Sequence, residues 1–397
     1  MHYRVVGPGH GLPGRRAGGM PSFWSAVATA LCTAAALHVI ALGGALLVPI
    51  LSPIVSGPAF AGQADGAGGP EAAPFKMVGG VRVIEGRTFT ETLTLDGHQW
   101  DGAVIRNNVF NNIADKGLHL SNVRGLSILD NRFTGIKSNA IKLRSDKNQG
   151  TEDILIKGNL FKDIAATAIL AGEPNVRLRI IGNRFENVAL ITSGEKQHAM
   201  YLKGPEFLVE GNVISGVIDA NGISVRTSGV VRGNFIEKAA KDGIKYYSSS
   251  ETKGSGRLVI EANVAVGNGH GGIALAAGKG PLVDQVEIRF NTLAGNGRGI
   301  WIYEDLDRVG ISIYGNLIVE ADKKYIYTRT KPTLETDNLE VDAEPGFVNA
   351  AGRDFNLVKA SPAVGFVRKA PGLPPYDYQG RSFGRPPYDA GAMQSAR

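Results

Sequence analysis

The sequence predicts an all-β solenoid, in which short strands wind through about nine to ten stacked coils. Three observations support this fold class. A short sequence pattern recurs nine times between Val104 and Arg329, and apolar residues alternate with other residues inside each copy. The chain also holds 53 glycines among 397 residues but only 7% aromatics, so turns interrupt it far more often than in a helical protein.

Each copy reads apolar-x-apolar-x-Gly-Asn-x-Phe or a near variant, and continues with Gly or Ala before Ile-x-Leu or Ile-x-Val. The equivalent asparagines lie 22 to 29 residues apart, which is typical of stacked structural units. They are Asn108, Asn131, Asn159, Asn183, Asn212, Asn234, Asn263, Asn291 and Asn316.

The alternation of apolar residues has a period of two, which predicts strands with one buried face. A unit of this length leaves no room for a helix between two or three strands, so each unit forms one coil. Stacked coils pair their strands into parallel sheets that run along one axis. With a rise of roughly 4.8 Å per coil, nine coils give a rod on the order of 43 Å long.

The Gly-Asn step suits a tight corner, because both residues tolerate a left-handed backbone. Stacked asparagines can also form a hydrogen-bonded ladder along the axis. The aromatic residue two positions later turns inward and stacks on its equivalents. This predicts that Phe110, Phe133, Phe161 and Phe185 are core residues.

Residues 1–61 differ in composition from the rest. Arg15 and Arg16 precede an Ala/Leu/Val-rich run that ends near Ala59-Phe60-Ala61, a small-x-small pattern typical of signal-peptide cleavage. We expect a signal peptide and a secreted or periplasmic protein. An uncleaved membrane anchor is the alternative, since the apolar run is long. Residues 62–78 then form a flexible spacer, 79–329 the solenoid and 330–397 an irregular C-terminal capping segment.

Charge and cysteine content exclude some kinds of ligand and site. Lys and Arg exceed Asp and Glu by 43 to 37, and three of these cations lie in the first 61 residues. This excess is too small to predict nucleic-acid binding. The single cysteine, Cys32, lies within the apolar run, so the exported part has neither a disulfide nor a cysteine metal site.

The Gly-Asn-x-Phe and Gly-Ile-x-Val coils from about Gly79 to Arg329 resemble those of single-stranded right-handed parallel β-helices of the pectin-lyase type. The ending, with Ala343–Asn349, Asp354–Leu357 and Ser361–Ala363, is similar to the C-terminal segment of secreted bacterial members. The resemblance implies a carbohydrate ligand. It does not specify the reaction, because this fold hosts several activities.

Two columns of side chains should face outward from the Gly-Ile-x-Leu strands. The first contains His119, Lys142, Leu170, Tyr201, Ser224, Lys245, Ala274, Trp301 and Tyr327. The second contains Ser121, Arg144, Gly172, Lys203, Arg226, Tyr247, Ala276, Tyr303 and Arg329. Neither column contains a carboxylate. Cations that pair with carboxylates, and aromatic rings that stack on sugars, suit an acidic polysaccharide.

We predict catalytic residues among His198, Tyr201, Lys203, Arg226 and Lys245, with substrate binding by His119, Lys142, Arg144, Tyr247, Trp301 and Tyr303. Removing the C5 proton of a uronate requires a neutralised carboxylate, a base and, for elimination, an acid at O4. Arg226 or Lys203 could neutralise, His198 or Lys245 could act as base, and Tyr201 could act as acid. A hydrogen-bonded turn histidine is an equally good interpretation of His198.

The first expectation is therefore a polysaccharide lyase. The alternatives are a C5-epimerase of a uronate polymer and a non-catalytic polysaccharide-binding protein. No cofactor is predicted. Calcium, which many lyases of this fold use, would need clustered acids, and Glu210, Asp219 and Asp242 do not form an obvious site in the sequence.

Overall fold

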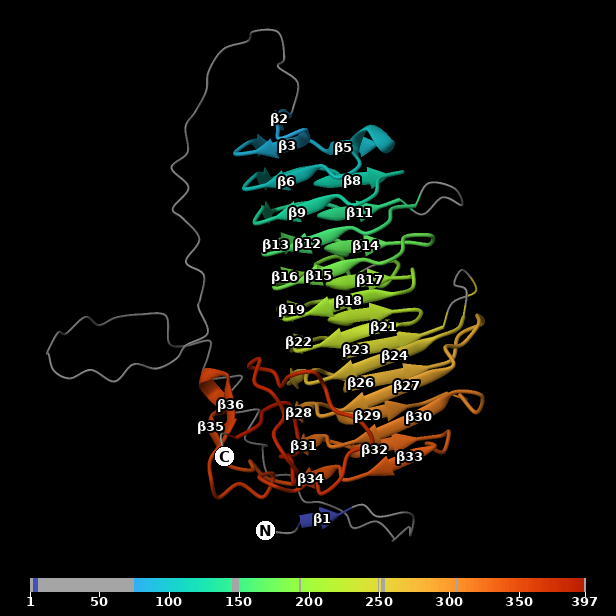
Figure 1. The fold of residues 1–397 in the computed structure, drawn as a ribbon, viewed down its shortest axis with the longest axis vertical. Coiled ribbons are helices and arrows are strands. Elements are labelled where there is room, and N and C mark those ends of the chain that lie inside the picture. Colours follow the sequence, from blue (N-terminus) through green and yellow to red (C-terminus); the bar gives the residue numbers. More distant parts are fainter. Residues whose placement is uncertain are drawn as a thin grey trace, which may run out of the picture. The chain divides into compact units, whose positions relative to one another are not determined.

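The computed structural model describes residues 3–5, 75–144, 150–192, 194–248, 250, 254–304 and 306–395. Three sheets of stacked strands dominate it, with 12, 12 and 10 strands (Figure 1). All neighbouring strands in them are parallel except the pairs β1–β34 and β2–β3. The ten strands of the third sheet give ten coils. The predicted parallel β-helix is therefore confirmed.

Sheet 1 consists of β2 (Lys76–Val78), β3 (Val81–Glu85), β6 (Val104–Arg106), β9 (Ser127–Leu129), β12 (Leu155–Lys157), β15 (Arg179–Ile181), β18 (Phe207–Glu210), β21 (Gly229–Arg232), β24 (Arg257–Glu261), β27 (Gln285–Arg289), β30 (Gly310–Tyr314) and β33 (Leu334–Thr336). Sheet 2 consists of β1 (Tyr3–Val5), β4 (Thr88–Phe89), β7 (Val109–Asn111), β10 (Arg132–Thr134), β13 (Leu160–Ile164), β16 (Arg184–Val188), β19 (Val213–Val217), β22 (Phe235–Ala239), β25 (Val264–Val266), β28 (Thr292–Ala294), β31 (Leu317–Val319) and β34 (Leu339–Val341). Sheet 3 consists of β5 (Leu93–Asp96), β8 (Leu118–Ser121), β11 (Ile141–Leu143), β14 (Ile169–Ala171), β17 (Met200–Leu202), β20 (Ile223–Val225), β23 (Asp242–Tyr247), β26 (Gly271–Ala276), β29 (Arg298–Ile302) and β32 (Lys324–Thr328).

A ladder of asparagine side chains follows the corner between sheets 1 and 2. Each Oδ1 accepts the backbone N–H and the Nδ2–H of the asparagine one coil earlier, as in Asn183 to Asn212 at 2.9 and 3.0 Å. The nine predicted asparagines are all buried members, and Asn338 adds a tenth. The residue before each of them takes the left-handed backbone, at φ 70° for Gly158 and 51° for Phe290. A residue in the left-handed conformation, which is glycine in five of the ten coils, therefore makes the corner, while asparagine connects the coils.

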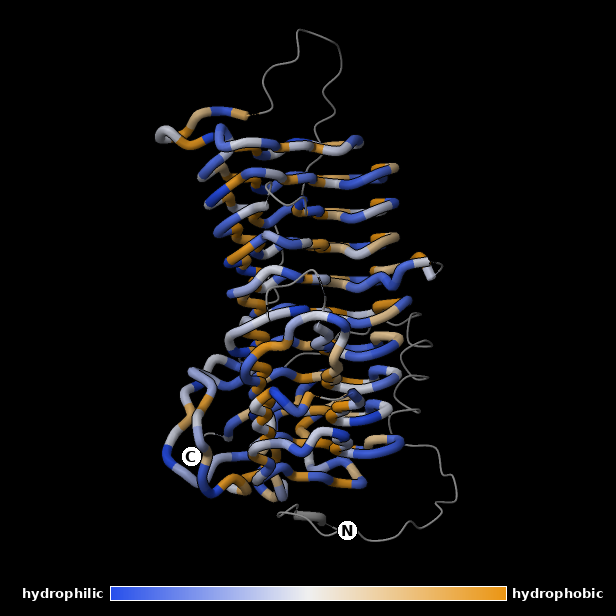
Figure 2. The backbone as a smooth tube through the Cα atoms, turned by 90° about the vertical axis from the view of Figure 1, so that its right-hand side faces the viewer, coloured by the Kyte–Doolittle hydropathy of each residue, from blue (hydrophilic) through white to orange (hydrophobic). Residues whose placement is uncertain are grey.

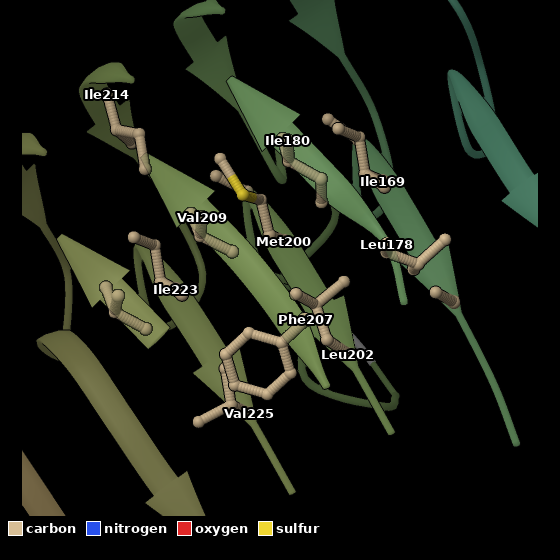
Figure 3. Close-up of a cluster of buried hydrophobic side chains, with 14 of the residues drawn as sticks. Ile169, Leu178, Ile180, Met200, Leu202, Phe207, Val209, Ile214, Ile223 and Val225 are labelled. Atoms are coloured by element: carbon tan, nitrogen blue, oxygen red, sulfur yellow. The ribbon is translucent and has the colours of Figure 1, made fainter. Parts of the chain in front are cut away.

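The solenoid interior is a column of apolar side chains. Phe89, Phe110, Phe133, Phe161 and Phe185 stack with ring centroids 4.5 to 5.1 Å apart, and the last four are fully buried, as predicted. Further along, aliphatic side chains from all three sheets meet inside the coils, including Ile180, Ile214 and Ile223 (Figure 3). The hydrophobic effect thus acts continuously along the axis. Figure 2 shows the coils from the side as stacked layers.

The C-terminal segment lies along the outer face of sheet 2 beside the last coils (Figure 1). Its hairpin, β35 (Phe347–Asn349) and β36 (Asp354–Leu357), places Phe355 against Phe235 of β22, with centroids 6.1 Å apart. Near the end of the segment, the Ala392 N–H donates to Thr292 Oγ1 in β28 at 2.9 Å. The predicted irregular segment therefore covers the side of sheet 2 and buries its outward residues.

Parallel pairing continues past Arg329 through β33 and β34 to Val341, because Asn338 extends the ladder by one coil. The predicted signal or anchor segment, residues 1–61, lies outside the described residues apart from Tyr3–Val5, as does most of the predicted spacer, 62–78. Within the described part of the chain, no helix is long and apolar enough to cross a membrane.

The ladder predicts the cost of removing one of its members. Asn212→Ala deletes the acceptor of two Asn183 N–H groups and the donor to Ile180 O and Asn234 Oδ1. Because buried groups lose their partners, we expect a loss of about 2–3 kcal/mol in the free energy of unfolding. Urea unfolding followed by circular dichroism measures it. Asn111→Ala, at a partly exposed site in β7, is the control, with an expected change below about 0.5 kcal/mol. Equal losses in both variants would contradict the ladder's role.

Candidate functional site

The register of sheet 3 aligns the outward residues as expected. Strand pairing places His119 beside Lys142, Tyr201 beside Ser224, and Ser224 beside Lys245. It also places Trp301 beside Tyr327. The columns begin one coil earlier than predicted, however, because Asp96 of β5 lies opposite Ser121 and accepts its hydroxyl at 2.7 Å. The expectation of a carboxylate-free face is thus wrong at this end.

Arg226 is held in a fixed position at the centre of this face. Its Nε donates to Tyr201 Oη at 3.2 Å, and its Nη1 donates to Ser224 Oγ at 3.0 Å. The guanidinium carbon lies 4.5 Å from the centroid of the Tyr201 ring and 5.2 Å from that of Tyr247. Three successive coils thus fix the plane of the guanidinium, which suits the planar recognition of a carboxylate.

Lys245 follows Arg226 on the next coil. Its ammonium lies 5.7 Å from the Tyr247 ring centroid and 5.0 Å from that of Tyr303. Only 19% of the side chain is exposed. Burial lowers the pKa of Lys245, nearby Arg226 lowers it further, and Asp242 opposes this shift. A lysine in such surroundings releases its proton more readily than an exposed one.

Asp242 was not predicted as a site residue, although it begins β23, the strand that contains Lys245. Its Oδ2 lies 3.8 Å from the lysine Nζ, and its Oδ1 is buried without a hydrogen-bond partner in the structure. Burial raises the pKa of Asp242 to about 6, against the opposing effect of Lys245. The sequence did carry a signal: Asp242 stands two residues before Ile244, just as His198 stands two residues before Met200.

His198 lies at the corner before β17, where the sequence placed it. It is buried, its Nδ1 accepts the backbone N–H of Asn221 at 3.2 Å, and its ring stacks on Tyr201 with centroids 5.4 Å apart. Burial lowers the pKa of His198 to about 3, with further effects of Arg226 and Lys245. The imidazole is therefore neutral at ordinary pH, with Nδ1 used as an acceptor.

The other candidates flank this centre in two groups. The Lys203 ammonium lies 5.3 Å from the Tyr201 ring centroid, and the rings of Trp301 and Tyr303 lie 4.3 Å apart. Burial raises the pKa of Tyr303, and Asp242 adds to this shift. These residues adjoin Arg226 and Lys245.

His119, Lys142 and Arg144 form a separate group on β8, on β11 and directly after β11. Between them and Tyr201 lies β14, whose outward residue is Leu170, and Gly172 directly follows this strand. Burial lowers the pKa of His119, and Lys116 and Lys142 act in the same direction. The structure therefore does not bring these three residues to the central cluster.

The described residues contain no group of three or more His, Cys, Asp or Glu side chains arranged to hold a metal ion. Asp219, one of the three acids that did not form an obvious calcium site in the sequence, pairs with Lys196 at 2.9 Å and accepts the Gln197 N–H at 2.7 Å. Its carboxylate thus stabilises the turn that precedes His198.

Comparisons with known proteins agree with the fold. The family described as "Right handed beta helix region" matches residues 147–318. Among solved structures, the crystal structure of the pectate lyase Pel9A shares 13% sequence identity, covers 79% of this chain and 88% of that chain, and has a TM-score of 0.41. No curated protein matches the sequence. Together with the three parallel sheets, the family match supports a right-handed parallel β-helix.

The state of His198 predicts a pH dependence of stability. Its pKa in the fold, about 3, lies below the ordinary 6.5, so the unfolded chain takes up a proton first as the pH falls. The contribution of His198 is complete above about pH 6.5 and is lost progressively below it. His198→Asn keeps an acceptor in place of Nδ1 but cannot titrate. Between about pH 7 and 4.5, the wild type should lose about 3 kcal/mol more than this variant in urea unfolding. Equal losses would mean that His198 is not held neutral.

Proposed function

We propose that the protein is a polysaccharide lyase that cleaves a uronate-containing polysaccharide by β-elimination. The observation that carries this proposal is the juxtaposition of Lys245 and Arg226 on the outer face of sheet 3. Lys245 has a pKa lowered by burial, and Arg226 has a fixed guanidinium plane. One group can take a proton from a carbon next to a carboxylate while the other stabilises the charge that develops.

The proposed step assigns one role to each of three residues. Arg226 binds the C6 carboxylate, and the neutral Lys245 amine removes the C5 proton. The C4–O4 bond then breaks, a C4=C5 double bond forms, and the leaving O4 takes a proton from Tyr201. Because Tyr201 Oη accepts the Arg226 Nε–H at 3.2 Å, its own O–H stays available to donate.

Lys245 fits the role of base better than His198 does, although the sequence left both open. His198 is buried, and its Nδ1 already accepts the Asn221 N–H. A general base must reach the proton that it abstracts, and this acceptor is occupied by backbone. We therefore assign His198 a positioning role: its ring supports Tyr201 from the corner.

The remaining residues of the face supply binding. Lys203, Tyr247, Trp301 and Tyr303 would contact the sugars next to the cleaved bond, through charge and ring stacking. The separate group of His119, Lys142 and Arg144 would bind a more distant part of a long chain. No cofactor is assigned to the reaction.

The proposed substrate is an extracellular polymer, so the proposal includes a secreted or periplasmic protein. The Ala/Leu/Val-rich run and Ala59-Phe60-Ala61 support export. Anchorage through an uncleaved N-terminal segment is the alternative, and only then would the protein contact a membrane.

A panel of polygalacturonate, alginate and hyaluronan tests the proposal through the ultraviolet absorbance of the unsaturated product. Lys245→Met should lower turnover at least about a hundredfold on the polymer that is cleaved, because a general base contributes that much or more. Arg226→Ala should cost roughly 3 kcal/mol in kcat/KM. Tyr201→Phe should lower kcat more than it raises KM, since the ring can still stack.

Lys157→Met, an exposed lysine of β12, is the matched control and should leave turnover unchanged. C5 exchange in deuterated water without cleavage would replace the lyase with an epimerase. If the wild type binds a uronate polymer but shows neither cleavage nor exchange, the face serves binding alone.

A further inference from the structure

A strip of basic residues lies at the start of four successive strands of sheet 3. Lys241, His270 and Lys323 directly precede β23, β26 and β32, and Arg298 begins β29. The backbone stacks Lys241, His270 and Lys323 in one column, since the His270 N–H donates to Lys241 O at 2.9 Å and the Lys323 N–H donates to Gly297 O at 3.1 Å. Arg298 directly follows Gly297 and pairs with Lys324, one position further along the strands. We call Lys241, His270, Arg298 and Lys323 the entry strip.

The entry strip differs from several arginines in or next to sheet 1. Among the described residues, no carboxylate forms an ion pair with Lys241, Arg298 or Lys323. In sheet 1 or just before its strands, by contrast, several arginines are neutralised in place. Examples are Arg106 with Glu85 at 2.5 Å, Arg177 with Asp153 at 2.7 Å, Arg232 with Glu261 at 3.1 Å and Arg289 with Glu261 at 2.6 Å.

Positive charge therefore accumulates along the entry strip. Burial and then Lys241, Lys245, Lys323 and Arg298 lower the pKa of His270, so all four cations act on one imidazole. Asp242 acts on Lys241 and Arg298, and Asp219 acts on Lys241, but their side chains are only 1% and 3% exposed. An approaching ligand thus meets the cations and not these two carboxylates. Such a surface attracts anions.

Trp301 connects the entry strip to the candidate site. The Arg298 guanidinium carbon lies 4.2 Å from the Trp301 ring centroid, and the His270 ring meets the same ring edge-on at 6.3 Å. Trp301 also contacts Tyr303, whose ring lies 5.0 Å from the Lys245 ammonium. A chain bound at Lys245 therefore reaches the strip by crossing the tryptophan.

We propose that the entry strip is a second anion-binding subsite, which takes carboxylates of uronate residues beyond the cleaved bond while Trp301 stacks on the sugar between. The proposal rests on the proposed function for the identity of the polymer. It adds that the bound chain turns from the face of sheet 3 over the corner where its strands begin. Binding at the strip needs no turnover, so the two proposals can fail separately.

The test measures binding of long and short galacturonate oligosaccharides by titration calorimetry at several salt concentrations. The variant Lys241→Gln/Arg298→Gln/Lys323→Gln should bind the long oligosaccharide about tenfold or more weakly. Its affinity for the disaccharide should stay the same. Its salt dependence should be shallower, because fewer ions are released on binding. The variant Lys157→Gln/Lys359→Gln/Lys369→Gln removes the same charge from exposed positions elsewhere and should bind as the wild type does.

Should the triple variant fold poorly, Lys241→Gln/Lys323→Gln keeps the Arg298–Trp301 contact and tests the same charge. Equal binding of long oligosaccharides by the strip and control variants would overturn the proposal. A loss confined to chondroitin sulfate, with galacturonate binding intact, would overturn the assignment to carboxylates. A wild type that binds galacturonate through the strip without cleaving any polymer would refute the lyase and leave the subsite standing.

Discussion

The asparagine ladder is the constraint on which the rest of the structure depends. Each member joins its own coil to the next through two hydrogen bonds, and the interior around it is apolar. A coil that slipped by one residue would leave these buried groups unpaired and would turn its apolar residues outward. The register of all three sheets is therefore fixed at one corner. The positions of Tyr201, Arg226 and Lys245 on neighbouring strands follow from it.

Much of this arrangement could be predicted because the ladder and the alternation appear in the sequence itself. The nine asparagines, the stacked phenylalanines and the outward columns all depend on local patterns that repeat in each coil. Asn338 was not predicted because the repeat was taken to end at Arg329, although Asp337 before it adopts the same left-handed backbone as the residues before the other asparagines. Asp242 was not predicted as a site residue because its role depends on contacts that form only in the folded structure. Only the fold shows that Lys245 lies 3.8 Å away and that no donor reaches Oδ1.

The packing of the C-terminal segment against sheet 2 could not be predicted from the sequence either. In β25 and β31, with the sequences VAV and LIV, all residues are buried because that segment covers the outward face as well. The continuous apolar runs were a readable signal of two buried faces. Which segment covers them depends on contacts between distant parts of the chain, such as Ala392 with Thr292. Local periodicity cannot specify these contacts.

In the candidate site, the fixed register of the coils changes the acidity of one lysine. Stacked coils bury Lys245 and bring Arg226 near it, and both effects lower the pKa of Lys245. The most direct test of the account is an NMR titration of the lysine amines, with Lys245→Met used to assign the signal. The account predicts that Lys245 loses its proton at a clearly lower pH than the lysine of a short unstructured peptide. Titration of Lys245 at the same pH as the peptide lysine would contradict it, because Lys245 would then be an ordinary surface lysine and not a base prepared by the fold.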